Sequence, residues 1–154
     1  ETVLNYIDKL QAGMILSKAE RYDIKGKMIL ASTEKYYAGD IGLRNIRKMS
    51  EQLDAGKLLE NAVYLEMLSR GYDVKIGKFD SQEVDFVCYK GRKKVYLQVA
   101  WLLTEECADR EFGNLEKIHD NYPKYVLSCD VIDMSRNGII HLNIIDFLFW
   151  RQEL

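Results

Sequence analysis

The sequence predicts an α/β fold with one mixed sheet flanked by helices. Helical and strand-like hydrophobic periods alternate along the chain, which is typical of helices packed on a sheet. Three strand-like runs stand together between two helical segments, over residues 73–102. The composition, 47% hydrophobic and 30% charged over 154 residues, is that of a globular protein long enough to bury a core.

The N-terminal third predicts a helix and a hairpin. Apolar residues at helical spacing indicate a helix over residues 2–13, and two strand-like runs follow over 19–24 and 28–33. The basic turn Lys25-Gly26-Lys27 joins those runs, which is a hairpin signal. A helix followed by a two-stranded ribbon is typical of the tail of a winged helix. We therefore expect residues 1–50 to form a partial winged-helix segment and a connector, the connector (36–49) having some helical character.

The remainder predicts the sheet and its helices. We place the domain boundary near residues 50–54, and expect residues 54–152 to form a second domain. An amphipathic helix begins near Gly56 and closes at Arg70-Gly71. The elements expected after it are strands over 73–79, 83–89 and 94–102, a helix over 104–119, strands over 124–129 and 139–142, and a helix over 144–150.

Charge and cysteine content limit the functional classes. A formal net charge of −2 argues against a wholly basic nucleic-acid coat, but it allows a local basic patch. No apolar run approaches the roughly 18 residues that a membrane span needs, and there is no signal peptide. Three cysteines without CxxC spacing indicate reduced thiols in a cytoplasmic protein. The chain starts at Glu1 in what reads as mid-helix, so we expect a missing N-terminal partner region.

An acid within an apolar strand is the strongest chemical signal. Asp85 lies between Val84 and Phe86 in an apolar strand, and strict alternation would put it on the face opposite both. If this strand pairs with the next one, Asp85 and Gln98 meet at the sheet's edge, where Glu60 can add a second carboxylate. Two carboxylates and an amide oxygen would suit Mg²⁺, which could polarise a phosphoryl oxygen. Taken singly, each residue also has an ordinary structural explanation: solvation, a salt bridge or a cross-strand hydrogen bond.

Basic residues cluster at the predicted strand turns. They could follow a phosphate backbone, or simply solvate the turns and protect edge strands. The candidate nucleic-acid contacts are Lys25, Lys27, Lys78, Lys90, Arg92, Lys93 and Lys94.

Several stretches, in order, resemble a known family. Gly56 to Asn61, Glu83 to Phe86 and Tyr96 to Val99 resemble the PD-(D/E)XK nuclease-like superfamily. More narrowly, residues 1–150 are similar to the C-terminal half of a prokaryotic family of AAA-type ATPases, a half known only as a domain of unknown function. The similar phrases are Tyr22 to Lys27, Lys35-Tyr36-Tyr37, Asp40 to Asn45, Arg110-Glu111-Phe112 and Asp120 to Leu127.

The resemblance implies a restriction-endonuclease-like fold and an ATPase module upstream. Nothing here resembles GxxxxGK[ST], so no ATPase activity is expected of this chain itself. In the superfamily pattern Glu60 is the helix acid, Asp85 the central aspartate and Gln98 the (D/E)xK acid, which makes these the candidate catalytic and Mg²⁺-binding residues. The lysine would fall at position 100, which is alanine.

Two departures from that pattern decide between functions. Gln98 carries no charge and Ala100 offers no donor, and loss of one such donor costs about 10²–10³ in rate. We therefore expect a nuclease-like, DNA-binding module of an ATPase with degenerate or lost catalysis. One alternative is a regulatory domain that packs on the ATPase module or a protein partner through Tyr36, Tyr37, Phe147, Phe149 or Trp150. Another is an active metal-dependent nuclease with a relocated lysine, such as Lys78, Lys94 or Lys117.

Overall fold

The structure, a computed structural model, describes residues 2–31, 34–46, 54–149 and 154. The helices in these ranges are α1 (Thr2–Ala12), α2 (Ile41–Ile46), α3 (Ala55–Ser69), α4 (Glu105–Glu116) and α5 (Ile144–Phe149). The strands are β1 (Leu16–Ala19), β2 (Arg21–Asp23), β3 (Met28–Ile29), β4 (Lys35–Ala38), β5 (Asp73–Phe79), β6 (Gln82–Lys90), β7 (Lys93–Val99), β8 (Lys124–Ser128) and β9 (Ile140–Asn143).

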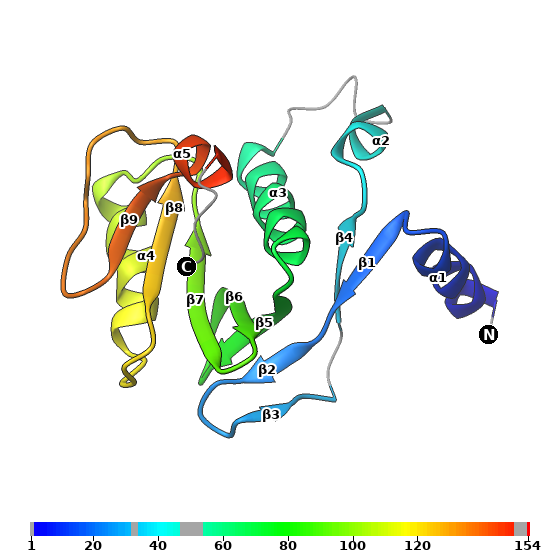
Figure 1. The fold of residues 1–154 in the computed structure, drawn as a ribbon, viewed down its shortest axis with the longest axis horizontal. Coiled ribbons are helices and arrows are strands. Elements are labelled where there is room, and N and C mark those ends of the chain that lie inside the picture. The colour runs from blue at the N-terminus through cyan, green and yellow to red at the C-terminus, as the bar shows by residue number, and fades with distance from the viewer. Residues whose placement is uncertain (1, 32–33, 47–53, 150–153) are drawn as a thin grey trace.

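A mixed sheet runs through the centre of the molecule (Figure 1). Within the described ranges it has seven strands in the order β3-β2-β5-β6-β7-β8-β9. Its middle strands β5, β6 and β7 are antiparallel, whereas β7, β8 and β9 are parallel to one another. The predicted fold class, a mixed sheet flanked by helices and preceded by a helix and a β-hairpin, is confirmed.

Helices cover both faces of the sheet and divide the core in two. Val63, Tyr64 and Met67 of α3 pack on one face, together with Phe147 of α5. Phe112 of α4 packs on the other face, in a cluster that also holds Leu115, Val126 and Ala100. None of the helices in the described ranges is long and apolar enough to cross a membrane.

The N-terminal hairpin belongs to this same sheet. It is formed by β2 and β3, and β2 pairs in parallel with β5. The expected two-domain division stays a prediction, although these two strands of the first part extend the sheet of the second. The proposed boundary falls mainly on residues 50–53, outside the described ranges.

A second, two-stranded sheet was not expected from the sequence. Here β1 and β4 pair antiparallel, with Leu16 opposite Ala38. The connector expected from residue 36 thus begins with residues of the strand β4, and α2 supplies the helical character that was expected of it. The predicted third strand of the central group is also too long, since β7 ends at Val99 rather than at residue 102.

A β-bulge interrupts the strict alternation predicted for β6. Lys75 pairs with Val87 and Gly77 pairs with Val84, so one residue of β5 faces two of β6, Asp85 and Phe86. As a result Val84 and Val87 both pack in the α4-side cluster, which strict alternation would forbid. Bulges re-aim side chains, and this one lies at the predicted central acid.

Candidate acidic site

The three predicted site residues come together in one open cleft of about 420 Å³. It lies where the N-terminal part of α3 meets the start of β6 and the end of β7. The cleft is lined by Asp54, Gly56, Lys57, Glu60, Glu83, Asp85, Gln98, Val99, Arg110, Glu111 and Asn114.

Helix α3 places Glu60 at the sheet's edge. Asp54 caps the helix by accepting a hydrogen bond from the Lys57 amide at 3.1 Å. Val63 and Tyr64, three and four residues after Glu60, are buried against the sheet, so Glu60 lies on the same face one turn earlier. Its side chain therefore points at the strand ends rather than into solvent.

Gln98 links the central aspartate to α4. Its Oε1 accepts a hydrogen bond from the Asp85 backbone amide at 2.6 Å, and its Nε2 donates to Glu111 Oε2 at 2.5 Å. Asp85 Oδ2 in turn accepts from the Val99 amide at 2.8 Å. Gln98 and Glu111 are both buried, so an amide that accepts on one side and donates on the other fits this position better than a carboxylate would.

A lysine that sequence reasoning missed contacts two of the cleft's carboxylates. Lys35, the first residue of β4, places its ammonium 2.7 Å from Glu60 Oε1 and 3.2 Å from Glu83 Oε1. Although burial opposes its charge, the Glu60 and Glu83 carboxylates raise the pKa of Lys35. Glu83 also pairs with Arg21, and the two cations hold its pKa below the usual value despite partial burial.

The cleft balances its own charge. Four of its five carboxylates have a basic partner: Asp54 with Lys57, Glu60 with Lys35, Glu83 with Arg21, and Glu111 with Arg110. The fifth, Asp85, has no ion-pair partner among the described residues. Its carboxyl lies deep among protein atoms, and this burial, followed by the negative charge of Glu60, raises the pKa of Asp85 to about 8. Burial and the Glu60 charge therefore both favour the protonated, uncharged form of Asp85.

The side chains as they stand do not fit a magnesium ion. Within the residues that the structure describes, no three His, Cys, Asp or Glu side chains are placed to hold a metal. The Gln98 oxygen is already used by Asp85, and Glu60 Oε1 is shared by Lys35 and the Tyr37 hydroxyl at 2.5 Å. Magnesium binding stays a prediction that this arrangement does not support.

Lys78, Lys94 and Lys117, the lysines proposed as replacements for the missing one, do not line the cleft. Lys94 is buried, with its ammonium 4.6 Å from the centre of the Tyr96 ring, 5.0 Å from that of Tyr122 and 3.7 Å from Asp120. Burial lowers its pKa, although Asp120 opposes the shift. Lys117 donates to Gln82 at 3.0 Å, and Lys78 is exposed on β5 opposite Glu83.

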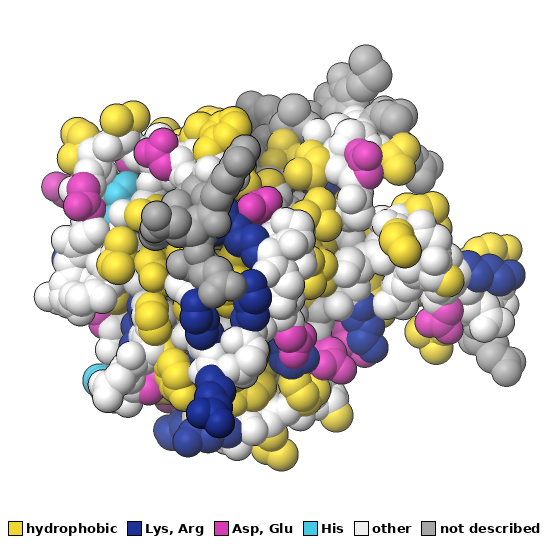
Figure 2. All heavy atoms as spheres, in the orientation of Figure 1, with side chains coloured by type: hydrophobic (Ala, Val, Ile, Leu, Met, Phe, Trp, Pro, Cys, Tyr) yellow, Lys and Arg dark blue, Asp and Glu magenta, His cyan; other side chains and the backbone are white. Residues whose placement is uncertain are grey.

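The predicted nucleic-acid contacts are divided between inward and outward side chains. Lys25, Lys27, Lys78, Arg92 and Lys93 are exposed. Lys94 is enclosed by tyrosines, and Lys90 donates to the Arg70 carbonyl at 2.9 Å. Figure 2 shows basic side chains gathered at the lower middle of this face, over the β2–β3 and β6–β7 turns of Figure 1.

The β6–β7 turn lies at the opposite end of those strands from the acidic cleft. Asp85 and Lys90 are five residues apart on β6, which is roughly 17 Å at the rise of an extended strand. A phosphate held at the turn therefore lies at the far end of the strands from the acids. Of the predicted contacts, Lys78 is nearest to the cleft in the strand register.

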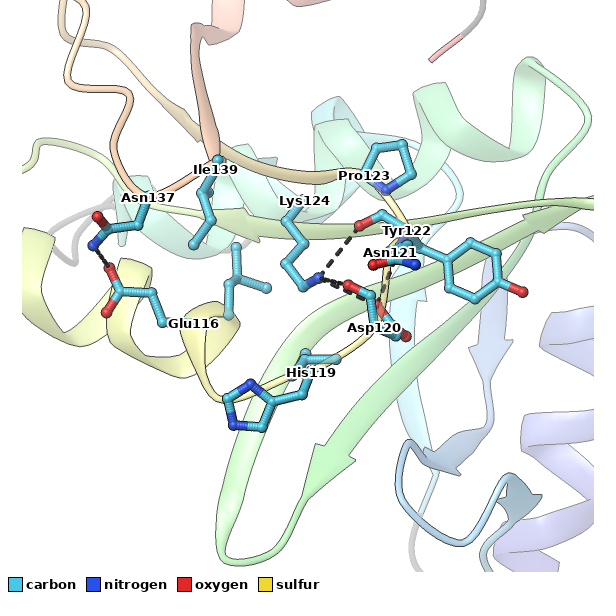
Figure 3. Close-up of a pocket in the computed structure, with 12 residues that line it drawn as sticks. Glu116, His119, Asp120, Asn121, Tyr122, Pro123, Lys124, Asn137 and Ile139 are labelled. Atoms are coloured by element: carbon cyan, nitrogen blue, oxygen red, sulfur yellow. Dashed lines mark hydrogen bonds and ion pairs between the residues drawn. The ribbon is translucent and has the colours of Figure 1, made fainter.

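A second hollow, of about 590 Å³, lies between the end of α4 and the start of β8 (Figure 3). In the close-up Lys124 extends toward Asp120, and its ammonium donates to the Asp120 carbonyl at 2.8 Å. Asn137 donates to Glu116 at 2.9 Å across the hollow. Its central polar groups are thus satisfied by one another, and none of the predicted site residues lines it.

Ser128, His141 and Asp130 resemble a hydrolase triad in composition only. The Met134 amide donates to His141 Nδ1 at 3.2 Å, which assigns the imidazole proton to Nε2, facing the Ser128 hydroxyl at 2.8 Å. The hydroxyl then donates to Asp130 Oδ2 at 2.7 Å. Because the histidine donates to the serine, it cannot take the serine's proton. The three side chains instead tie β8 to β9 and to the loop that follows β8.

Comparison with known proteins shows two relatives of unassigned function. The chain is 36% identical over 148 residues to an uncharacterized protein of Haemophilus influenzae, covering 96% of this chain and 36% of that protein. It is 31% identical over 121 residues to the uncharacterized protein MJ1544 of Methanocaldococcus jannaschii, covering 76% of this chain and 26% of that protein. The chain therefore spans about a third or less of these relatives. No family model and no solved structure matches.

Proposed function

We propose that this chain is a nucleic-acid-docking module with a PD-(D/E)XK nuclease-like fold, that it belongs to a longer cytoplasmic ATPase, and that it has lost metal-dependent cleavage. The observation that carries the loss of cleavage is the internal charge balance of the acidic cleft. Lysine and arginine side chains neutralise four carboxylates there, and burial together with the Glu60 charge favours the protonated form of the fifth. A nuclease site of this class needs carboxylates that are free to bind a divalent cation.

Position 100 supports the same conclusion. Ala100 stands where the resemblance expects the lysine, and it is buried in the α4-side cluster. The Lys57 ammonium, which lines the cleft, pairs with Asp54. The Lys35 ammonium, which contacts the cleft's Glu60 and Glu83, is held by these two carboxylates.

Plasmid cleavage tests the loss of activity. We expect no nicking of supercoiled DNA by the chain with Mg²⁺ or Mn²⁺ over several hours. Cleavage that Asp85→Ala abolishes would overturn this part of the proposal and would establish an active nuclease with a relocated lysine.

Salt-dependent binding tests the docking role. The exposed residues Lys27 and Arg92, on the two neighbouring turns, are the groups to change. We expect the double variant Lys27→Glu/Arg92→Glu to weaken binding of a labelled duplex, and to lower the slope of log K against log salt by about one per lost phosphate contact. Lys9→Glu on α1 is the control, because it reverses one charge far along the chain from these turns; equal loss in both would contradict a local docking surface.

A regulatory role is favoured by one separate observation. Helix α1 has no buried residue in the described structure, and Val3, Leu4 and Tyr6 are each more than 60% exposed. Of the aromatic residues proposed as contacts, Phe149 is exposed and Tyr36 partly so, Tyr37 and Phe147 are buried, and Trp150 lies outside the described residues. If α1 docks on the ATPase module, its amides should gain protection from hydrogen exchange when that module is added.

A further inference from the structure

Lys35 is the feature of the cleft that neither the family pattern nor the strand pattern explains. Its ammonium lies between two carboxylates from different elements, Glu60 of α3 and Glu83 of β6. It comes from β4, a strand that pairs with β1 in the two-stranded sheet and not with the main sheet.

Three contacts fix β4 against α3 next to this lysine. Asn61 accepts from the Ala38 amide and donates to the Ala38 carbonyl, both at 2.9 Å. The Tyr37 ring stacks on Tyr64 with centroids 4.1 Å apart. The Tyr37 hydroxyl donates to Glu60, so the strand that carries the lysine is bonded to the lysine's own partner.

The alternation of β4 directs Lys35 inward. Lys35 and Tyr37 are two residues apart and so share a face of the strand, whereas Tyr36 between them is turned outward and 37% exposed. Because Tyr37 is held against Glu60 and Tyr64, Lys35 is directed to the same side. The position of the ammonium is therefore fixed by packing on both sides of it.

We propose that the Lys35 ammonium occupies the cation position between Glu60 and Glu83 at the acidic cleft, and that it closes the cleft to divalent metal ions. This inference rests on the proposed function, since it names the group that keeps the site metal-free. When Lys35 is removed, Glu60 loses its cation while Glu83 keeps Arg21, so the cleft gains one net negative charge beside Asp85. Oxygen ligands of that kind at the same cleft suit Mn²⁺ and Mg²⁺.

Manganese binding by variants tests the inference. The probe is Mn²⁺ itself, with free ion measured by electron paramagnetic resonance and heats by titration calorimetry. We expect no saturable Mn²⁺ binding to the unchanged chain over the concentrations tested. Lys35→Met should bind one ion per chain, with a dissociation constant at least tenfold below the highest of those concentrations. Lys35→Arg keeps the positive charge and should bind no better than the unchanged chain.

Lys75 offers a matched control. Its ammonium also bridges two carboxylates, Glu20 at 3.0 Å and Asp73 at 3.2 Å, but neither of these lines the acidic cleft. Lys75→Met removes a lysine from an equally acidic pair, so a gain of Mn²⁺ binding there as large as in Lys35→Met would overturn a special role for Lys35. Adding Asp85→Asn to Lys35→Met should reduce the gained affinity, which assigns the ion to this cleft.

The remaining outcomes separate the inference from the proposed function. If neither Lys35→Met nor the more conservative Lys35→Gln, both checked for folding by circular dichroism, binds Mn²⁺ better than the unchanged chain, the inference is wrong and the lost-cleavage proposal stands. If the unchanged chain binds Mn²⁺ as tightly as Lys35→Met and cleaves DNA, both are wrong.

Discussion

Replacing Asp85 with asparagine should change how the stability of the chain depends on pH. The pKa of Asp85 is raised from 3.8 to about 8 by burial and by the neighbouring Glu60 charge. Between those values the folded chain holds one more proton at this position than the unfolded chain does. Stability must therefore fall as pH rises through that window, and the loss is complete above the folded-state pKa.

The size of the effect follows from the proton count. One proton retained only by the folded state gives a slope of about 1.4 kcal/mol per pH unit. From about pH 5 to about pH 7 the unchanged chain should thus lose on the order of 3 kcal/mol of unfolding free energy relative to Asp85→Asn. The asparagine oxygen can still accept the Val99 amide hydrogen bond, so the geometry that Asp85 provides is preserved.

Urea unfolding followed by circular dichroism at several pH values is the assay. The comparison uses the difference between two pH profiles, so any constant change in stability caused by the substitution cancels. Asp8→Asn, at an exposed position on α1, is the control for removing one carboxylate. Parallel profiles for Asp85→Asn and the unchanged chain would mean that Asp85 is already ionised in the folded protein, and the charge balance of the cleft would have to be recounted.

Three further substitutions test the surrounding geometry. Gln98→Glu should set a carboxylate against Glu111 in place of the 2.5 Å hydrogen bond. We expect it to lower the free energy of unfolding by about 1–3 kcal/mol at pH 8 and by less at pH 5. An equal loss at both pH values would contradict the charge argument. Gly77→Ala should lower the free energy of unfolding by about 1–3 kcal/mol, because the new Cβ would lie 2.8 Å from Val87 and 2.9 Å from Val84 beside the bulge. The control is Gly113→Ala on α4, whose Cβ meets nothing within 4 Å, and thermal melts should show it to be neutral or stabilising. Ser128→Ala should destabilise by about 1–3 kcal/mol, and a fluorophosphonate probe should leave Ser128 of the unchanged chain unlabelled, since His141 donates to it.

The sequence predicted the sheet and the convergence of Glu60, Asp85 and Gln98 because local signals carry that information. Period-2 and period-3.6 patterns locate β5, β6 and α3 to within a residue or two, and the short basic turn between β6 and β7 makes them a hairpin. Once these elements are placed, an acid early on one strand and a glutamine late on the next must lie near each other.

The rest of the cleft depends on contacts that no local pattern records. Lys35 is 48 residues from Glu83, and its strand pairs with β1 rather than with a neighbour in the main sheet. The bulge at Asp85 exists only in the register between β5 and β6, so the sequence of β6 alone reads as uninterrupted alternation. Lys94 reads as a surface lysine at a basic turn, and its burial is decided by tyrosines from β2, β6, β7 and the loop before β8.

The attachment of β2 to β5 sets a practical limit on shortening this protein. A chain cut to begin at Asp54, the start suggested by the sequence, would discard β2 and leave the backbone donors and acceptors of β5 without their parallel neighbour. An uncovered strand edge of that kind recruits strands from other molecules. Such a truncated chain should self-associate, and it should do so at the flank of the sheet that β2 and β3 normally cover.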